Sequence, residues 1–159
     1  MPILQRLVEL LDKNQASYRL VNHPSAGKSA EVALARGTEV GQGAKALVYE
    51  MINHDGSTRR VLAVLPADRQ LDWKMLASAL SAKKARLLGL DETRLLTSCE
   101  IGAIPPFSFN EELLLVVDPQ LQERYKVIAF NAGRLDTSIL LDTSDYLAIA
   151  KPRLLRIAG

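Results

Sequence analysis

The chain has 159 residues, of which 48% are hydrophobic and 24% charged, and its formal net charge is +2. These values are those of an ordinary globular protein long enough to bury one core, and the weak charge excludes a dedicated, strongly basic nucleic-acid binder. No apolar run approaches about 20 residues and the first residues lack the order of a signal peptide, so we expect no membrane span and a cytoplasmic protein. No linker rich in proline, glycine or serine divides the chain, so we expect residues 1–159 to form a single domain.

Periodicity and turn signals predict the elements of the chain in order. They are a helix over 3–14, a strand over 17–22, a helix over 28–36 ended by Gly37, strands over 44–50 and 60–65 joined by the turn Asn53-His54-Asp55-Gly56, a helix capped by Asp68 or Asp72 and running to about 81, a short helix opening at 91–94, strands over 113–117, 126–130 and 138–141, and a last helix capped by Thr143-Ser144-Asp145 and running to about 150. This interleaving, with one hairpin and no repeat, predicts an α/β fold: one layered domain whose mixed, partly antiparallel β-sheet is flanked by helices.

The loop Gly102-Ala103-Ile104-Pro105-Pro106 is the first candidate for chemistry. A glycine permits close approach of a ligand to the backbone, and two prolines stiffen the other end of the loop. Backbone N–H groups held in this way suit a carbonyl oxygen or a developing oxyanion. The alternative is a plain rigid turn between a helix and a strand, which this segment alone favours.

Lys45 is the second candidate, in the segment Gly41-Gln42-Gly43-Ala44-Lys45-Ala46-Leu47-Val48. The strand pattern places Lys45, Leu47 and Tyr49 on one face. Because lysine is rarely buried without a partner, its ammonium group is expected to face a cleft or a bound anion such as a phosphate. The alternative is a lysine whose stem covers apolar surface while its charge reaches water.

The remaining reactive side chains give weaker signals. His23 lies at a strand-to-helix junction and is a candidate for lining a site, whereas His54 is expected to be only a turn residue. Cys99, the single cysteine, has no visible activating base, so we do not expect a nucleophile. No metal-ligand spacing, phosphate-binding loop or dinucleotide fingerprint is present, and no cofactor or metal is expected.

Three separated segments together resemble the YbaK family of aminoacyl-tRNA editing domains, which includes the insertion domain of bacterial prolyl-tRNA synthetases. They are residues 41–48, residues 102–109 and Ile128-Ala129-Phe130-Asn131-Ala132-Gly133. The resemblance runs over almost the whole chain and is strongest to the freestanding, YeaK-like branch. It implies a mixed sheet flanked by helices, a cleft for the 3′ end of a tRNA, and hydrolysis of the ester that joins a wrong amino acid to that end.

The resemblance also implies roles for individual residues. Lys45 matches the essential lysine of the family, and Gly102, Ala103 and Ile104 of the glycine loop would carry catalysis with it. Pro105 and Pro106 complete that loop and, with Asn131, Ala132 and Gly133 beside the pocket, would bind substrate. The expected partners are a mischarged aminoacyl-tRNA and an aminoacyl-tRNA synthetase.

Some relatives place a histidine late in the chain, in the amino-acid pocket, but this sequence has none after His54. The amino acid therefore cannot be carried over from them, and we expect a small one: Ser, Thr or Ala. Two alternatives stay open. The first is a noncatalytic module that binds tRNA or a synthetase, and the second is a hydrolase of small esters unrelated to tRNA. The basic residues at 83–86 and 151–156 contact either tRNA or only solvent.

Overall fold

The computed structural model describes all residues from Met1 to Gly159. Its helices are α1 (Ile3–Lys13), α2 (Ser29–Arg36), α3 (Trp73–Ala79), α4 (Leu90–Thr97), α5 (Gln120–Arg124) and α6 (Thr143–Ala150), with a 3-10 turn η1 (Val40–Gln42). Its strands are β1 (Tyr18–Asn22), β2 (Ala44–Ile52), β3 (Thr58–Pro66), β4 (Lys84–Leu87), β5 (Leu113–Val117), β6 (Val127–Asn131), β7 (Thr137–Asp142) and β8 (Arg153–Leu154). No helix is long and apolar enough to cross a membrane.

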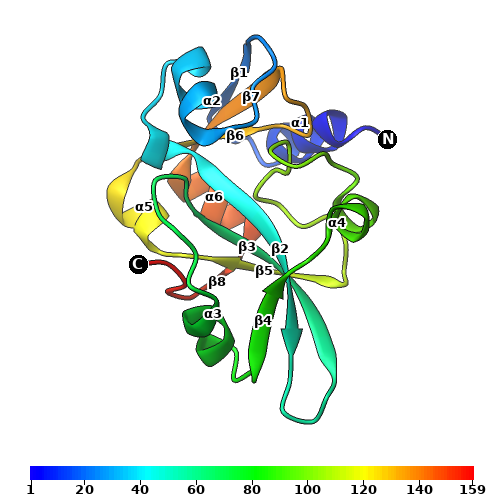
Figure 1. Ribbon diagram of the computed structural model, residues 1–159. Coiled ribbons are helices and arrows are strands. Elements are labelled where there is room, and N and C mark those ends of the chain that lie inside the picture. Colours follow the sequence, from blue (N-terminus) through cyan, green and yellow to red (C-terminus); the bar gives the residue numbers. More distant parts are fainter.

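The strands form two sheets, in the orders β1-β7-β6 and β4-β2-β3-β5-β8. The first is antiparallel, whereas the second combines the antiparallel β2–β3 hairpin with parallel pairing of β3 to β5 and β5 to β8. In Figure 1 the smaller sheet lies at the top with α1 and α2, and the long hairpin reaches the opposite end of the molecule. The predicted mixed α/β fold is confirmed.

The two sheets meet beside η1. Gly43, which follows η1, forms a parallel bridge to Ala129 of β6, and its carbonyl accepts a hydrogen bond from the N–H of Ala67 at 2.9 Å. The first residues of β2 therefore lie between the smaller sheet and the end of β3. This junction brings residues from distant parts of the chain together, and the pocket described below opens there.

The main core fills the space between the sheets and their helices. Leu7 and Leu11 of α1 enter it from one side and Tyr146 of α6 from another, all at 0% exposure. The rings of Phe107 and Tyr146 meet edge to face with centroids 5.1 Å apart. Since Phe107 directly follows the proline end of the glycine loop, that end is fixed to the core.

Most predicted elements are confirmed, and a few differ. Gly37 does end α2 with a left-handed φ of 72°, and His54 does lie in the hairpin turn. The last helix is capped by Asp142, whose carboxylate accepts a hydrogen bond from the N–H of Asp145. The prediction that Thr143-Ser144-Asp145 caps this helix was therefore wrong by one residue. Asp72 caps α3. The basic segment 83–86 lies largely in β4, an edge strand that the sequence analysis missed along with α5 and β8.

Candidate active site

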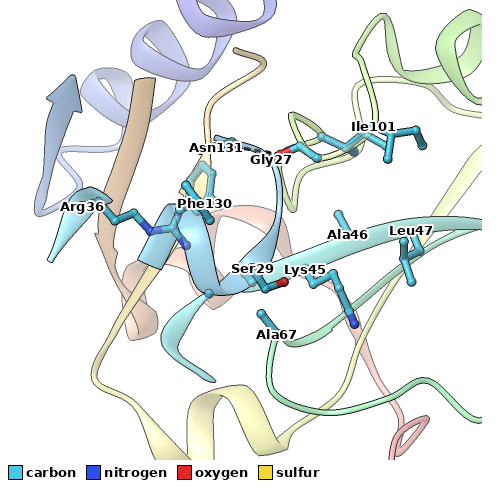
Figure 2. Close-up of a pocket in the computed structure, with 15 residues that line it drawn as sticks. Gly27, Ser29, Arg36, Lys45, Ala46, Leu47, Ala67, Ile101, Phe130 and Asn131 are labelled. Carbon is cyan, nitrogen blue, oxygen red and sulfur yellow. Dashed lines mark hydrogen bonds between the residues drawn. The ribbon is translucent and has the colours of Figure 1, made fainter. Parts of the chain in front are cut away.

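A pocket of about 160 Å³ opens at the junction of the two sheets. This is smaller than the roughly 300–1,000 Å³ typical of pockets for drug-sized ligands, so the pocket suits a small chemical group. Its rim includes the exposed residues Gly27, Ile101 and Gly102, and its inner wall includes the buried residues Phe130 and Asn131. Figure 2 shows these residues with the others that line the pocket.

Lys45 lines the pocket from the start of β2, where the sequence analysis expected a cleft-facing lysine. Its Nζ donates to the carbonyl oxygen of Arg69 at 3.2 Å and makes no ion pair within 4.0 Å. Partial burial lowers the pKa of Lys45, because a charged ammonium group is less stable away from water. The lysine thus places an uncompensated positive charge beside the pocket.

The glycine loop reaches the pocket through Gly102 and Ile104. The backbone N–H of Ala103 donates to the carbonyl oxygen of Glu100 at 3.0 Å, whereas those of Gly102 and Ile104 have no partner within the protein. Gly102 has a left-handed φ of 87°, which a side chain would strain. Of the three predicted oxyanion-binding residues, Gly102 and Ile104 therefore offer free donors.

Three carbonyl groups of this loop accept hydrogen bonds from the rest of the protein. Asn131 Nδ2 donates to the carbonyl of Gly102 at 2.9 Å, and the N–H of Gly133 donates to that of Ala103 at 2.9 Å. The buried Tyr146 hydroxyl donates to the carbonyl of Pro106 at 2.6 Å. Fixing the carbonyls fixes the peptide planes, and this also fixes the orientation of the unpaired N–H groups of Gly102 and Ile104.

The other predicted binding residues lie behind the pocket. Ala132 is fully buried, and Gly133 packs so closely on Ile3 that an added Cβ would lie 2.8 Å from the Ile3 side chain. Pro105 and Pro106 are buried on the core side of the loop. Of the predicted substrate-binding set, only Asn131 lines the pocket itself.

His23 also lies behind the pocket rather than in its wall. Its Nδ1 is 2.8 Å from the carbonyl of Pro24, which can only accept, so this nitrogen carries a proton. Its Nε2 is 2.7 Å from Ser138 Oγ, and Ser138 donates to Asn131 Oδ1 at 2.9 Å. His23 is therefore linked to the pocket through a buried polar chain.

Arg36 also lines the pocket, as a second charged residue besides Lys45, and the sequence did not predict it. No acidic residue lines the pocket, and burial lowers the pKa of Arg36 to about 10. Figure 2 shows Arg36 and Lys45 on different sides of the pocket. No local sequence pattern marks Arg36, because it is held by Ser138, which is 102 residues away in the chain.

Cys99 and the basic segments do not reach the pocket. Burial raises the pKa of the Cys99 thiol to about 11, so it stays protonated at neutral pH. Arg86 pairs with Glu50 at 3.0 Å and Arg156 with Glu123 at 2.8 Å. Neither arginine presents a wholly free charge.

A compact pocket with two cations, unpaired backbone donors and no acid suits a small polar ligand, and comparison with known proteins identifies the family of the chain. A family profile for the aminoacyl-tRNA editing domain matches residues 23–149. The chain belongs to this family.

Individual relatives agree with that assignment. Over 150 residues the chain is 50% identical to the multifunctional Ser/Thr-tRNA deacylase ProXp-y of Escherichia coli strain K12. The match covers 94% of this chain and 89% of the relative. A crystal structure of a hypothetical protein superposes with a TM-score of 0.84 at 20% identity, covering 97% of this chain and 99% of the other. A crystal structure of a candidate trans-editing enzyme for prolyl-tRNA synthetase gives 0.81 at 23% identity, covering 100% and 98%. At these identities the two structures establish the fold.

Proposed function

We propose that this protein is a trans-editing aminoacyl-tRNA deacylase, which hydrolyses the ester of a tRNA mischarged with a small amino acid. The observation that carries the proposal is the 50% identity, over 94% of the chain, to a protein named as a Ser/Thr-tRNA deacylase. The small pocket and its free donors are consistent with that activity. Ser and Thr are the first candidates for the amino acid, ahead of Ala.

The residues of the pocket suggest how hydrolysis would proceed. A water oxygen attacks the ester carbon, the bond to the ribose oxygen breaks, and the proton lost by water ends on that ribose oxygen. Donation from the N–H groups of Gly102 and Ile104 would stabilise the oxyanion of the tetrahedral intermediate. An aminoacyl ester is already activated, so holding ester and water together supplies much of the rate.

Lys45 would anchor the terminal phosphate of the tRNA. Its ammonium group is a compact charge without a carboxylate partner. The 3′ end would then lie over the rim with the aminoacyl group directed inward. Asn131 would act on the loop through Gly102, while Ala103, Pro105, Pro106, Ala132, Gly133 and His23 would support the pocket from behind.

The broader setting follows from the same proposal. The whole chain, residues 1–159, would act as one editing domain in the cytoplasm, where tRNA is charged. It would receive mischarged tRNA released by an aminoacyl-tRNA synthetase, with or without direct contact.

The test is hydrolysis of a panel of Ser-, Thr-, Ala- and Cys-tRNA by the purified protein at several salt concentrations. We expect hydrolysis of Ser- or Thr-tRNA with a kcat/KM that falls as salt rises, because phosphate contacts release counterions. Failure to hydrolyse any member, with tRNA binding retained, would instead indicate the noncatalytic module. Salt-independent hydrolysis of small amino-acid esters alone would indicate the small-ester hydrolase.

A further inference from the structure

Arg36 is a buried guanidinium group without a carboxylate partner. The residue is 7% exposed, and none of the ion pairs in the structure includes it. Arginine is almost never buried in this way unless it is paired, because the lost hydration must be replaced. Its position in the pocket wall suggests that the replacement comes from a ligand.

Two of the three nitrogens of the guanidinium group are held by the protein. Nε donates to Thr38 Oγ1 and Nη1 donates to Ser138 Oγ, each at 3.2 Å. Ser138 is fully buried and bonded to Asn131, so the orientation of Arg36 is tied to that of the pocket wall. A guanidinium group has five N–H donors, and these contacts use two of them.

The third nitrogen, Nη2, is free. Nη2 has no hydrogen-bond partner. Among the side-chain nitrogen and oxygen atoms that are buried away from solvent, only Thr143 Oγ1 lacks a hydrogen-bond partner. Nη2 therefore keeps some accessible surface, and the pocket that Arg36 lines is where this surface can be reached. Gly43 leaves room for Nη2, since an added Cβ there would lie 3.0 Å from it.

The surroundings of Nη2 limit what it can bind. Val32 and Phe130 are buried apolar neighbours in the same wall, and no acidic group is present. The ligand must therefore be small, must fit an apolar wall and must offer an acceptor. An internucleotide phosphate continues into the chain on both sides, so it fits the open rim better than a buried wall. An amino-acid side chain ends in the pocket and can reach it.

We propose that the free Nη2 of Arg36 binds the side-chain hydroxyl of the substrate amino acid. The proposal rests on the deacylase function above and makes Arg36 a residue that selects hydroxylated amino acids. A hydroxyl oxygen accepts from Nη2, whereas a methyl group of similar size leaves Nη2 unpaired. A site built to hydrogen-bond a substrate hydroxyl discriminates strongly against the analogue that lacks it.

The test compares pairs of substrates that differ by the hydroxyl. Ser-tRNA is compared with Ala-tRNA, and Thr-tRNA with tRNA carrying α-aminobutyrate, in which a hydrogen replaces the hydroxyl. For the wild type we expect kcat/KM about 10- to 100-fold higher for the hydroxylated member of each pair, in the range of a charge-assisted hydrogen bond. For Arg36→Met we expect both ratios to fall to about 1, through slower hydrolysis of Ser- and Thr-tRNA. Arg19→Met, which removes an exposed arginine of β1, should keep the wild-type ratios.

These ratios separate the outcomes. A ratio within one preparation does not depend on the fraction of active protein, so partial unfolding of Arg36→Met cannot mimic the result. Equal wild-type rates within each pair would overturn the proposal without any variant. An equal loss on all four substrates in Arg36→Met would also overturn it, because Arg36 would then act on a group common to all of them. No hydrolysis of any substrate by the wild type would contradict the deacylase function itself.

Discussion

Gly102 lies directly against Gly27, so that a Cβ added to Gly102 would lie 2.9 Å from the carbonyl oxygen of Gly27 and 3.1 Å from its Cα. Both contacts are to backbone, which cannot rotate away as a side chain can. Asn131 holds the same two loops together, since its Nδ2 donates to the carbonyls of Ala26 and Gly102 at 2.9 Å each. The rim of the pocket is thus two loops in backbone contact, with a side-chain amide bridging them from below.

Gly102→Ala should therefore both destabilise the protein and displace the rim. The left-handed φ and the backbone clash together predict a loss of about 1–3 kcal/mol in the free energy of unfolding. Because the free N–H of Gly102 moves with the loop, we expect at least a tenfold fall in kcat/KM in protein that is still folded. Urea unfolding and single-turnover deacylation measure the two effects.

Gly89→Ala is the matched control for that variant. Gly89 has a φ of −64°, and an added Cβ there would have no neighbour within 4 Å. Gly89 is the N-cap of α4, where Gly is preferred to Ala, so we expect a loss of about 0.5–1 kcal/mol in the free energy of unfolding and no loss of activity. A Gly102→Ala protein as stable and active as Gly89→Ala would show that the loop contact is unimportant.

Tyr146→Phe tests the anchor at the proline end of the loop. The variant keeps the ring in the core but removes the hydroxyl that donates to Pro106, leaving a buried carbonyl without a partner at a cost of about 1–3 kcal/mol. Tyr18→Phe removes a hydroxyl bonded to Asp12 at the surface and should cost less. Chemical denaturation compares them, and equal losses would contradict a special role for the buried anchor.

Cys99 should be unreactive in the folded protein. Its side chain is buried, and burial raises its pKa to about 11, so little thiolate is present at pH 7–8. We expect slow alkylation by iodoacetamide under native conditions, fast alkylation in urea, and deacylation by Cys99→Ala close to wild type. Rapid native alkylation that abolished activity would instead identify Cys99 as part of the site.

The lowered pKa of Lys45 predicts a pH-dependent stability. In the window between the folded pKa and the ordinary value of 10.5, the unfolded chain binds more protons at this site, so the contribution of Lys45 to stability rises with pH. Lys45→Met removes that dependence. We expect the stability of the variant relative to wild type to be greatest near pH 7 and to shrink toward pH 10.5. Denaturation of both proteins across this range measures it, and a constant difference would contradict the assigned shift.

The sequence predicted elements whose signals are local. The turn Asn53–Gly56 and the helix end at Gly37 depend on backbone preferences that neighbouring residues carry. β4 was missed because Lys84-Ala85-Arg86-Leu87 is short and charged, and it forms a strand only by pairing with the edge of β2. β8 likewise depends on β5, which lies far away in the chain.

The residues of the pocket also divide into those that local sequence predicts and those that depend on distant contacts. Lys45 and Gly102 stand in recognisable segments, and both line the pocket. Arg36 has no such segment: near the end of α2 it has the sequence of an ordinary exposed cation that favours the helix dipole. Its burial depends on Ser138 of β7, which is 102 residues away in the chain, and such a contact leaves no local pattern.

The most direct measurement is single-turnover deacylation of Ser- and Thr-tRNA by the wild type, Lys45→Ala and Lys13→Ala. Lys13 is exposed at the end of α1, so Lys13→Ala removes the same charge away from the pocket. We predict hydrolysis by the wild type and by Lys13→Ala, and a loss of at least 100-fold in a folded Lys45→Ala protein. Equal rates for all three proteins would contradict the assignment of this pocket as the editing site.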